Sequence, residues 1–269
     1  LHYPLRRQRQ MCIRDRDNRA CFISYITAGD PSLKDSTKIL ETLAANGVDI
    51  IELGVPFSDP ISDGPTIQRA TERSLKNKIN IDDALNMIRK FRLKYKTPVI
   101  LFGYYNPFLQ YGLKKIMRSI KKAGGDGVLI VDLPPEEAEE TQRAVNEAGI
   151  ELVYLIAPTS TKERIDIISK LSNSFIYLVS VTGVTGARKK LDVNLKKFIE
   201  KVKRKTKKPV CVGFGISEPS HVETLKRQSN GIIIGSAIIK IIEDNLGNRP
   251  MICKKIASFA KKIKKSTIY

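Results

Sequence analysis

The sequence predicts an α/β protein made of a single domain, a (β/α)8 barrel. Short apolar runs of strand length alternate with amphipathic segments of helix length through most of the chain. Eight such runs are present, and their continuous Val, Ile and Leu content is typical of parallel strands that are covered on both faces. The 269 residues fit the roughly 250 residues that one such barrel commonly occupies. An open, doubly wound sheet is the alternative, and the lack of a G-x-G-x-x-G motif after the first run counts against it.

The first 19 residues differ from the rest of the chain. They are rich in arginine, show no apolar periodicity and include the string M-C-I-R-D-R. We expect residues 1–19 to be a basic extension that is non-native or disordered, and residues 20–269 to form the barrel. A remnant of an organelle-targeting segment is the alternative, but the serines and the amphipathic pattern of such segments are lacking.

The predicted elements follow one another in a regular order. The first helix opens at Pro31 and ends at Gly47, and glycines that look like similar helix stops precede later strands at Gly125, Gly149 and Gly231. The strands are expected at 20–27, 48–53, 98–103, 127–132, 151–156, 175–180, 209–215 and 231–235. The later helices are expected at 66–76, 81–95, 109–123, 135–148, 162–171, 193–205, 219–227 and 237–243, followed by a helical C-terminal segment.

The composition favours a globular protein without a membrane or nucleic-acid partner. No apolar run approaches the roughly 18 residues of a membrane span. The formal net charge is +19, but the lysines recur on the polar faces of successive helices, so solvated faces explain them better than a phosphate-binding surface for nucleic acid. The positive field can still attract a phosphorylated substrate. The four cysteines and two histidines lack metal-ligand spacing, which predicts no metal site and a reducing compartment.

One carboxylate stands out because it interrupts an apolar strand. Glu52 lies within V-D-I-I-E-L-G, and the loop that follows carries Asp59 and Asp63. A glutamate facing the barrel interior loses hydration, which raises its pKa towards neutrality, and a second carboxylate in the same cleft completes an acid and base pair. The alternative is a solvent-facing glutamate with two aspartates that cap turns. Tyr177, inside the sixth strand, is either a core residue or aimed at the barrel interior.

Glycines and hydroxyl residues collect after the last three strands. If the sheet closes, the carboxyl ends of its strands share one rim where the site is expected. Gly213 and Gly215 allow close approach of backbone amides, and Gly235 and Ser236 begin a short helix whose N-terminus suits a phosphate group. Tight turns without a ligand are the alternative. The loop 181–190, with two Thr-Gly pairs, has the length of a flexible lid or of an ordinary surface loop.

Five motifs in this order resemble a known family. They are E-L-G-V-P-F-S-D-P-I-S-D-G-P-T-I-Q, G-Y-Y-N-P, S-V-T-G-V-T-G-A-R, G-F-G-I-S and I-G-S-A-I-I-K. Together they are similar to the tryptophan synthase alpha subunit over residues 22 to about 259. The resemblance implies a TIM barrel that cleaves indole-3-glycerol phosphate to indole and glyceraldehyde 3-phosphate. It also implies an alpha2-beta2 heterotetramer, in which a beta subunit carrying pyridoxal phosphate receives the indole.

The resemblance also implies roles for residues at matching positions. Glu52 matches the proton-transferring glutamate, Asp63 the aspartate that holds the indole N–H, and Tyr177 the tyrosine beside them. The expected substrate-binding residues are Tyr25, Gly186, Gly213, Gly215, Gly235 and Ser236. The expected contacts to the beta subunit are Asp59, Pro60 and Asn106.

The chain departs from the family pattern in three places. Nothing in residues 1–19 resembles the helix that the family has ahead of the first strand, and loss of that helix exposes apolar surface and lowers stability. Ser24 replaces the usual proline, and Ser62 stands where alanine is common.

The expected chemistry needs no metal or organic cofactor in this chain, and the expected compartment is the cytoplasm or the plastid stroma. The alternatives are a stand-alone indole-releasing lyase, a different phosphosugar barrel enzyme such as an isomerase, and a basic binding scaffold without activity.

Overall fold

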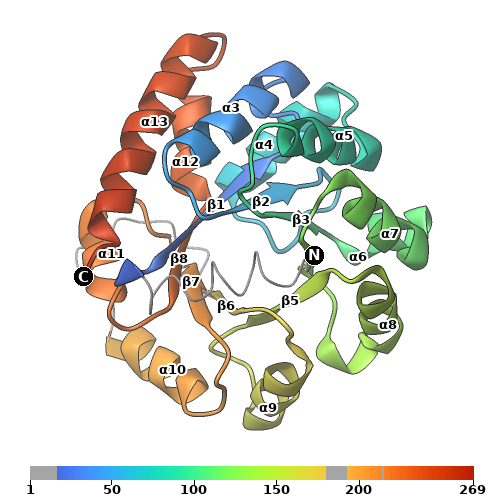
Figure 1. The fold of residues 1–269 in the computed structure, drawn as a ribbon, viewed down its shortest axis with the longest axis vertical. Coiled ribbons are helices and arrows are strands. Elements are labelled where there is room, and N and C mark those ends of the chain that lie inside the picture. Colours follow the sequence, from blue (N-terminus) through green and yellow to red (C-terminus); the bar gives the residue numbers. More distant parts are fainter. Residues whose placement is uncertain (1–16, 180–192, 214) are drawn as a thin grey trace.

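The protein forms a closed barrel of eight parallel strands with helices on its outside (Figure 1). The computed structural model describes residues 17–179, 193–213 and 215–269. The strands follow sequence order around the barrel, and β8 pairs with β1 to close it. This arrangement confirms the predicted fold class. The strands are β1 (Cys21–Thr27), β2 (Ile50–Gly54), β3 (Val99–Gly103), β4 (Gly127–Ile130), β5 (Glu151–Ile156), β6 (Ile176–Val179), β7 (Val210–Gly213) and β8 (Gly231–Ile234).

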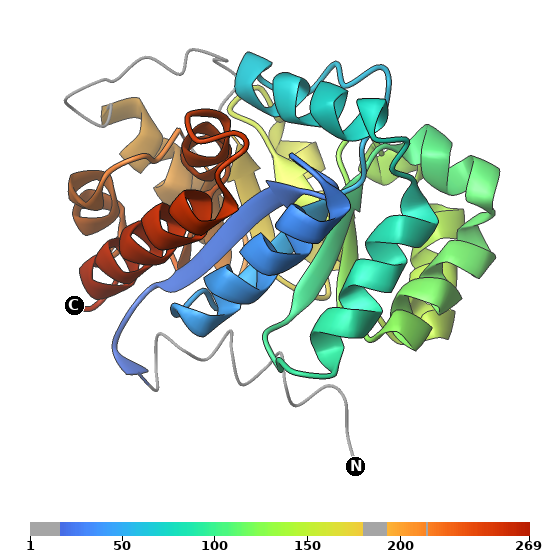
Figure 2. The ribbon, with the colours of Figure 1, turned by 90° about the horizontal axis from the view of Figure 1, so that it is seen from above.

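The strands are largely buried because helices cover the outside of the barrel (Figure 1) while side chains fill its interior. The helices are α3 (Leu33–Ala45), α4 (Pro65–Lys76), α5 (Ile81–Arg92), α6 (Tyr105–Tyr111), α7 (Leu113–Ala123), α8 (Glu139–Ala148), α9 (Lys162–Leu171), α10 (Val193–Lys203), α11 (Pro219–Leu225), α12 (Ser236–Glu243) and α13 (Arg249–Ser266), with a 3-10 helix η1 (Pro135–Glu137). Figure 2 shows α3 and α13 lying along β1, and these two helices contact each other.

Local sequence explains where several helices begin and end. The Ser32 side chain accepts a hydrogen bond from the Asp35 N–H and caps α3, and Asn80 and Asp83 form a reciprocal capping box at the start of α5. The segment expected as one helix at 109–123 is two helices, because Gly112 adopts a φ of +92° between α6 and α7.

The expected helix stops are partly wrong. Gly47 and Gly149 have positive φ angles and follow helices as expected. The left-handed residue after α7 is Gly124, with a φ of +89°, and not Gly125. Gly231 is the first residue of β8, where a Cβ would lie only 2.6 Å from the Cys211 Sγ. Gly231 is therefore required by packing inside the barrel, not by a turn.

A buried ion cluster ties the two ends of the barrel chain together at the amino ends of the strands. The Asp49 carboxylate accepts hydrogen bonds from both terminal nitrogens of Arg19, at 2.7 and 2.9 Å, and from the Lys264 Nζ at 2.8 Å. It also accepts the Phe22 backbone N–H at 2.8 Å. Arg19 forms a backbone bridge with Ile268. Residues 17–19 of the expected extension are thus described, and residues 1–16 lie outside the described part.

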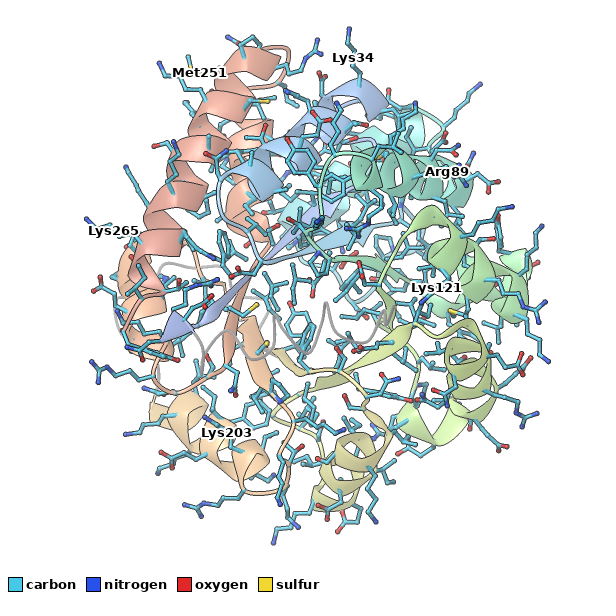
Figure 3. All side chains as sticks on the ribbon, in the orientation of Figure 1. Lys34, Arg89, Lys121, Lys203, Met251 and Lys265 are labelled. Carbon is cyan, nitrogen blue, oxygen red and sulfur yellow. The ribbon has the colours of Figure 1, made fainter. Side chains whose placement is uncertain are left out.

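The basic side chains are distributed over the outer helices. Lys34 on α3, Arg89 on α5 and Lys265 on α13 are exposed and extend away from the barrel in Figure 3. Within the described residues, none of the helices has both the length and the apolar character that crossing a bilayer requires.

Candidate active site

Most of the described residues that the sequence predicts for the site lie in the strands or in the loops that follow their carboxyl ends. Glu52 lies on β2, two residues before the end of the strand, in register with Tyr25 on β1 and Ile100 on β3. Its side chain is fully buried, and neither carboxyl oxygen has a hydrogen-bond partner among the described residues. Burial without compensation disfavours the charged form and raises the pKa of Glu52 to about 8. The carboxyl is therefore mostly protonated at neutral pH.

The second predicted carboxylate lies in the loop between β2 and α4. Asp63 is partly exposed, and burial raises its pKa to about 6 while a hydrogen bond with Tyr104 acts in the opposite direction. Tyr104 is buried, and its hydroxyl oxygen accepts the Ser62 N–H at 3.0 Å. Tyr104 therefore holds the loop that carries Asp63.

Two tyrosines join the carboxylates inside the barrel mouth. Tyr25 is 7% exposed, its hydroxyl lies 3.3 Å from the Thr27 Oγ1, and its ring meets the Phe102 ring edge-on at 5.1 Å. Burial raises the pKa of both Tyr25 and Tyr177 well above the ordinary value. Negative charge nearby adds to this effect, first from Asp63 for Tyr25 and first from Glu52 for Tyr177. The structure thus brings these two carboxylates and two phenols into one site.

The predicted phosphate-binding residues lie on the rim formed by β7 and β8. Gly235 precedes α12, and Ser236 is its first residue, so the free N–H groups of that helix start face the rim. Gly215 has a φ of +61°, and a Cβ there would meet no atom of the described residues within 4 Å. At Gly213 a Cβ would lie 2.5 Å from the Tyr177 ring, so glycine is needed there for packing against the tyrosine. Gly186 and the predicted lid at 181–190 lie outside the described residues.

The predicted partner contacts lie on the outer side of the same rim. Asp59 and Asn106 are exposed, and Pro60 is partly exposed. A groove of about 300 Å³ runs beside the β2–α4 loop and is lined by Asp59, Pro60 and Ile61, among others. Ile61 is 84% exposed, which gives this loop an apolar surface. The structure does not bring these residues into the barrel interior with Glu52.

Three residues of the site are missing from the sequence-based prediction. Tyr104 holds the Asp63 loop, Thr27 contacts the Tyr25 hydroxyl, and Gly54 leaves the space that the Tyr25 ring fills. The Y-Y-N-P string at the end of the third strand is the one signal that points to Tyr104.

Comparison with known proteins agrees with this geometry. A family model described as tryptophan synthase alpha chain matches residues 12–268. The chain belongs to the tryptophan synthase alpha chain family. A tryptophan synthase alpha chain of Solibacter usitatus is 43% identical over 250 residues, covering 93% of each chain. Another, of a Roseiflexus species, is 46% identical over 226 residues, covering 84% of this chain and 87% of the relative.

Solved structures of the tryptophan synthase alpha chain family share the fold. The tryptophan synthase subunit alpha of Legionella pneumophila superposes with a TM-score of 0.89 at 35% identity, covering 97% of this chain and 98% of that one. A chain of the tryptophan synthase complex from Pyrococcus furiosus superposes with a TM-score of 0.84 at 34% identity, covering 91% and 98%. The resemblance drawn from the five motifs is therefore confirmed, whereas the roles of individual residues stay predictions.

Proposed function

We propose that the barrel mouth of this chain cleaves indole-3-glycerol phosphate to indole and glyceraldehyde 3-phosphate, with Glu52 as the proton-transferring group. The observation that carries this proposal is the fully buried Glu52 carboxyl, which lacks a hydrogen-bond partner among the described residues and has a pKa of about 8. A general acid works best when its pKa lies near the working pH. The reaction is that of a carbon–carbon lyase in tryptophan biosynthesis.

Glu52 acts twice in this scheme. The protonated carboxyl first gives its proton to C3 of the indole ring, which turns the ring into an electron sink. The carboxylate that remains then takes the proton of the glycerol hydroxyl on the carbon attached to the ring. The carbon–carbon bond breaks, its electron pair returns to the ring, and the hydroxyl-bearing carbon becomes the aldehyde of glyceraldehyde 3-phosphate. Protons and electrons balance, and the scheme requires neither a metal nor an organic cofactor.

Asp63 supplies the charge that Glu52 lacks. With a pKa of about 6 it is mostly ionised at neutral pH, so it can stabilise the positive charge that develops at the ring nitrogen after C3 is protonated. The hydrogen bond with Tyr104 favours this ionised form. The two carboxyl groups thus start the reaction in opposite protonation states, because Asp63 is partly exposed and bonded to Tyr104, whereas Glu52 is fully buried without a partner in the described part of the chain.

The phosphate end of the substrate is assigned to the rim of β7 and β8. The N-terminal N–H groups of α12 offer hydrogen-bond donors and the positive end of a helix dipole. Gly235 and Ser236 stand at this helix start, and Gly215 follows β7, the strand before β8 in the barrel. Gly186 remains assigned to the same function by its position in the motif.

We also propose that a beta subunit docks on the outer rim, where Asp59, Pro60 and Asn106 lie. The exposed Ile61 side chain and the adjoining groove support a protein contact, since exposed apolar surface of this kind favours burial. The Pyrococcus furiosus relative comes from a tryptophan synthase complex. Pyridoxal phosphate is then expected only in the beta subunit, and an alpha2-beta2 heterotetramer is the expected assembly.

The test is indole release from indole-3-glycerol phosphate, measured with and without a beta subunit. Glu52→Gln should abolish turnover while substrate binding is retained, and Asp63→Asn should impair turnover strongly. Glu223→Gln on the outside of α11 removes an exposed charge far from the mouth and serves as the matched control. Parent-like turnover by Glu52→Gln would refute the assignment. Full activity without any beta subunit would instead favour a stand-alone lyase.

A further inference from the structure

Three side chains near Glu52 share one packing arrangement, in which each lies over a glycine of the next strand. Tyr25 on β1 covers Gly54 on β2, Tyr177 on β6 covers Gly213 on β7, and Cys211 on β7 covers Gly231 on β8. In each pair a Cβ on the glycine would collide with the covering side chain. The glycines therefore make room for a layer of side chains inside the barrel.

Tyr25 closes this layer on the side of the barrel mouth. Gly54 lies two residues after Glu52 on the same strand, so the two residues face the same side of β2. A Cβ on Gly54 would collide with the Tyr25 hydroxyl and would lie 2.7 Å from the ring carbon that bears it. The Tyr25 phenol therefore fills the space that a side chain at position 54 would take, directly above Glu52. The Tyr25 ring also packs edge-on against the Phe102 ring on β3, so the apolar layer continues to that strand.

Cys211 closes the layer on the side of the barrel floor. It is fully buried, pairs in register with Tyr177 on one side and with Gly231 on the other, and its Sγ lies over Gly231. Burial raises the pKa of its thiol, and the charge of Glu52 adds to this effect. A thiol is only a weak hydrogen-bond donor. Cys211 thus excludes water without solvating the carboxyl.

The other ionisable groups around Glu52 do not provide solvation. Tyr177 lies on β6, and the charge of Glu52 raises the pKa of its phenol. Asp63, in the β2–α4 loop, raises the pKa of both the Tyr25 and the Tyr177 phenol. The strands β3, β4 and β8 carry no ionisable side chain. On β5, Glu151 lies at the amino end, and Tyr154 points outward to donate a hydrogen bond to Gln142 of α8.

We propose that Tyr25 and Cys211 are positioning residues that wall off the Glu52 carboxyl from water, one above and one below, and so keep it protonated until substrate arrives. The proposal deepens the function assigned above and rests on it. Gly54 and Gly231 are part of the same device, because a side chain at either position would push the covering group away. Removing either covering group would let water or a strong hydrogen-bond donor reach the Glu52 carboxyl. Both stabilise the carboxylate and would lower its pKa.

The experiment titrates Glu52 directly in the intact chain. The carbonyl stretch of the protonated carboxyl is followed by infrared difference spectroscopy against pH, and the Glu52→Gln variant identifies the band. Tyr25→Ala opens the upper wall, and Tyr25→Phe keeps the ring as its matched control. Cys211→Ser introduces a stronger donor of similar size, and Cys211→Ala keeps the lower wall apolar.

We expect the Glu52 midpoint to fall by about one pH unit or more in Tyr25→Ala and in Cys211→Ser, and to stay near the parent value in the two controls. The alkaline limb of kcat/KM should move in parallel. Parent-like midpoints in both opened variants would overturn the proposal. Circular dichroism checks folding, and Tyr25→Leu replaces Tyr25→Ala if the latter does not fold.

The proposed function and the proposed roles of Tyr25 and Cys211 would be contradicted by different results. If the parent releases no indole at any pH, the proposed function is wrong although the infrared titration is still readable. If the parent is active and the midpoints do not move, only the roles of Tyr25 and Cys211 are wrong.

Discussion

Asp49 and Glu52 are only three residues apart, yet the surroundings of their carboxyl groups differ in the hydrogen-bond partners that they offer. Both are buried, with 7% and 0% of the residue exposed. Asp49, at the amino end of β2, accepts hydrogen bonds from Arg19, Lys264 and the Phe22 N–H. Glu52, near the carboxyl end, has no hydrogen-bond partner among the described residues. One carboxylate is thus satisfied by cations and a backbone N–H, whereas the other is buried without such partners, as the proposed proton-transfer role of Glu52 requires.

The paired arrangement recurs elsewhere at the amino ends of the strands. Asp126, just before β4, accepts the Arg92 guanidinium at 2.8 Å and the Val99 N–H at 3.0 Å. Like Asp49, which binds two cationic side chains, it combines a cationic partner with a backbone N–H near the start of an earlier strand. The amino ends therefore use satisfied carboxylates for stability, in keeping with the division of labour usual in barrels of this kind.

Glu52→Gln should have the largest effect on activity of the variants considered. Because the amide cannot transfer the proton, we expect the rate of indole release to fall about 10³-fold or more, the range typical of a lost general acid and base. The free energy of unfolding should not fall, since the carboxyl makes no hydrogen bond to the described residues that the variant could lose. A chemical-denaturation curve beside the indole assay measures both. A loss of stability without a loss of rate would place Glu52 in the same class as Asp49.

The pH dependence of stability tests the same contrast without a substrate. The pKa of Glu52 is raised from 4.5 to about 8 on folding, so between these values the folded state holds a proton that the unfolded state has lost. The free energy of unfolding should therefore fall by about 3–4 kcal/mol from pH 5 to pH 8 through this group. The same denaturation series on Glu52→Gln should lack this component. An identical pH slope in both proteins would contradict the raised pKa.

Asp49→Asn should mainly affect stability. The change leaves the Arg19 and Lys264 charges without their carboxylate, and breaking a buried pair usually costs about 3–5 kcal/mol. The side chains of Arg19 and Lys264 are 13% and 25% exposed. We therefore expect a smaller loss of about 2–4 kcal/mol in the free energy of unfolding. Asp166→Asn, which removes an exposed ion pair with Lys205, is the control. Equal losses in the two variants would show that the Asp49 cluster has no special role.

The smallest expected effect concerns another buried polar group without a partner. Ser24 on β1 is fully buried, and its hydroxyl lacks a hydrogen bond among the described residues. Ser24→Ala removes this hydroxyl and should raise the free energy of unfolding by about 1 kcal/mol. Ser229→Ala, which removes a hydroxyl bonded to the Leu225 carbonyl, should lower it. Thermal melts of the two variants moving in the same direction would contradict this interpretation.

The sequence was sufficient to predict the barrel and the buried carboxyl of Glu52 inside it, and the catalytic role of Glu52 stays a prediction. The strands are visible because burial on both faces demands continuous apolar runs, and Glu52 is visible because it interrupts one of them. Gly54, Thr27 and Tyr104 were not predicted, since their roles depend on which strands are neighbours and on how the Tyr25 ring leans across β2. Gly231 was misread as a helix stop because the chain alone does not show that Cys211 lies over it.

The ion cluster around Asp49 also bears on how the chain is made. Arg19 precedes the first strand and Lys264 belongs to the last helix. The Asp49 carboxylate therefore forms ion pairs with the segments before the first strand and after the last one. A ribosome releases these segments in order. Until β8 and α13 have emerged, the edge of β1 that pairs with β8 has no strand beside it. Before that point the sheet is not closed and exposes an unpaired strand edge, which is prone to aggregation. Chaperones would be most useful at this stage.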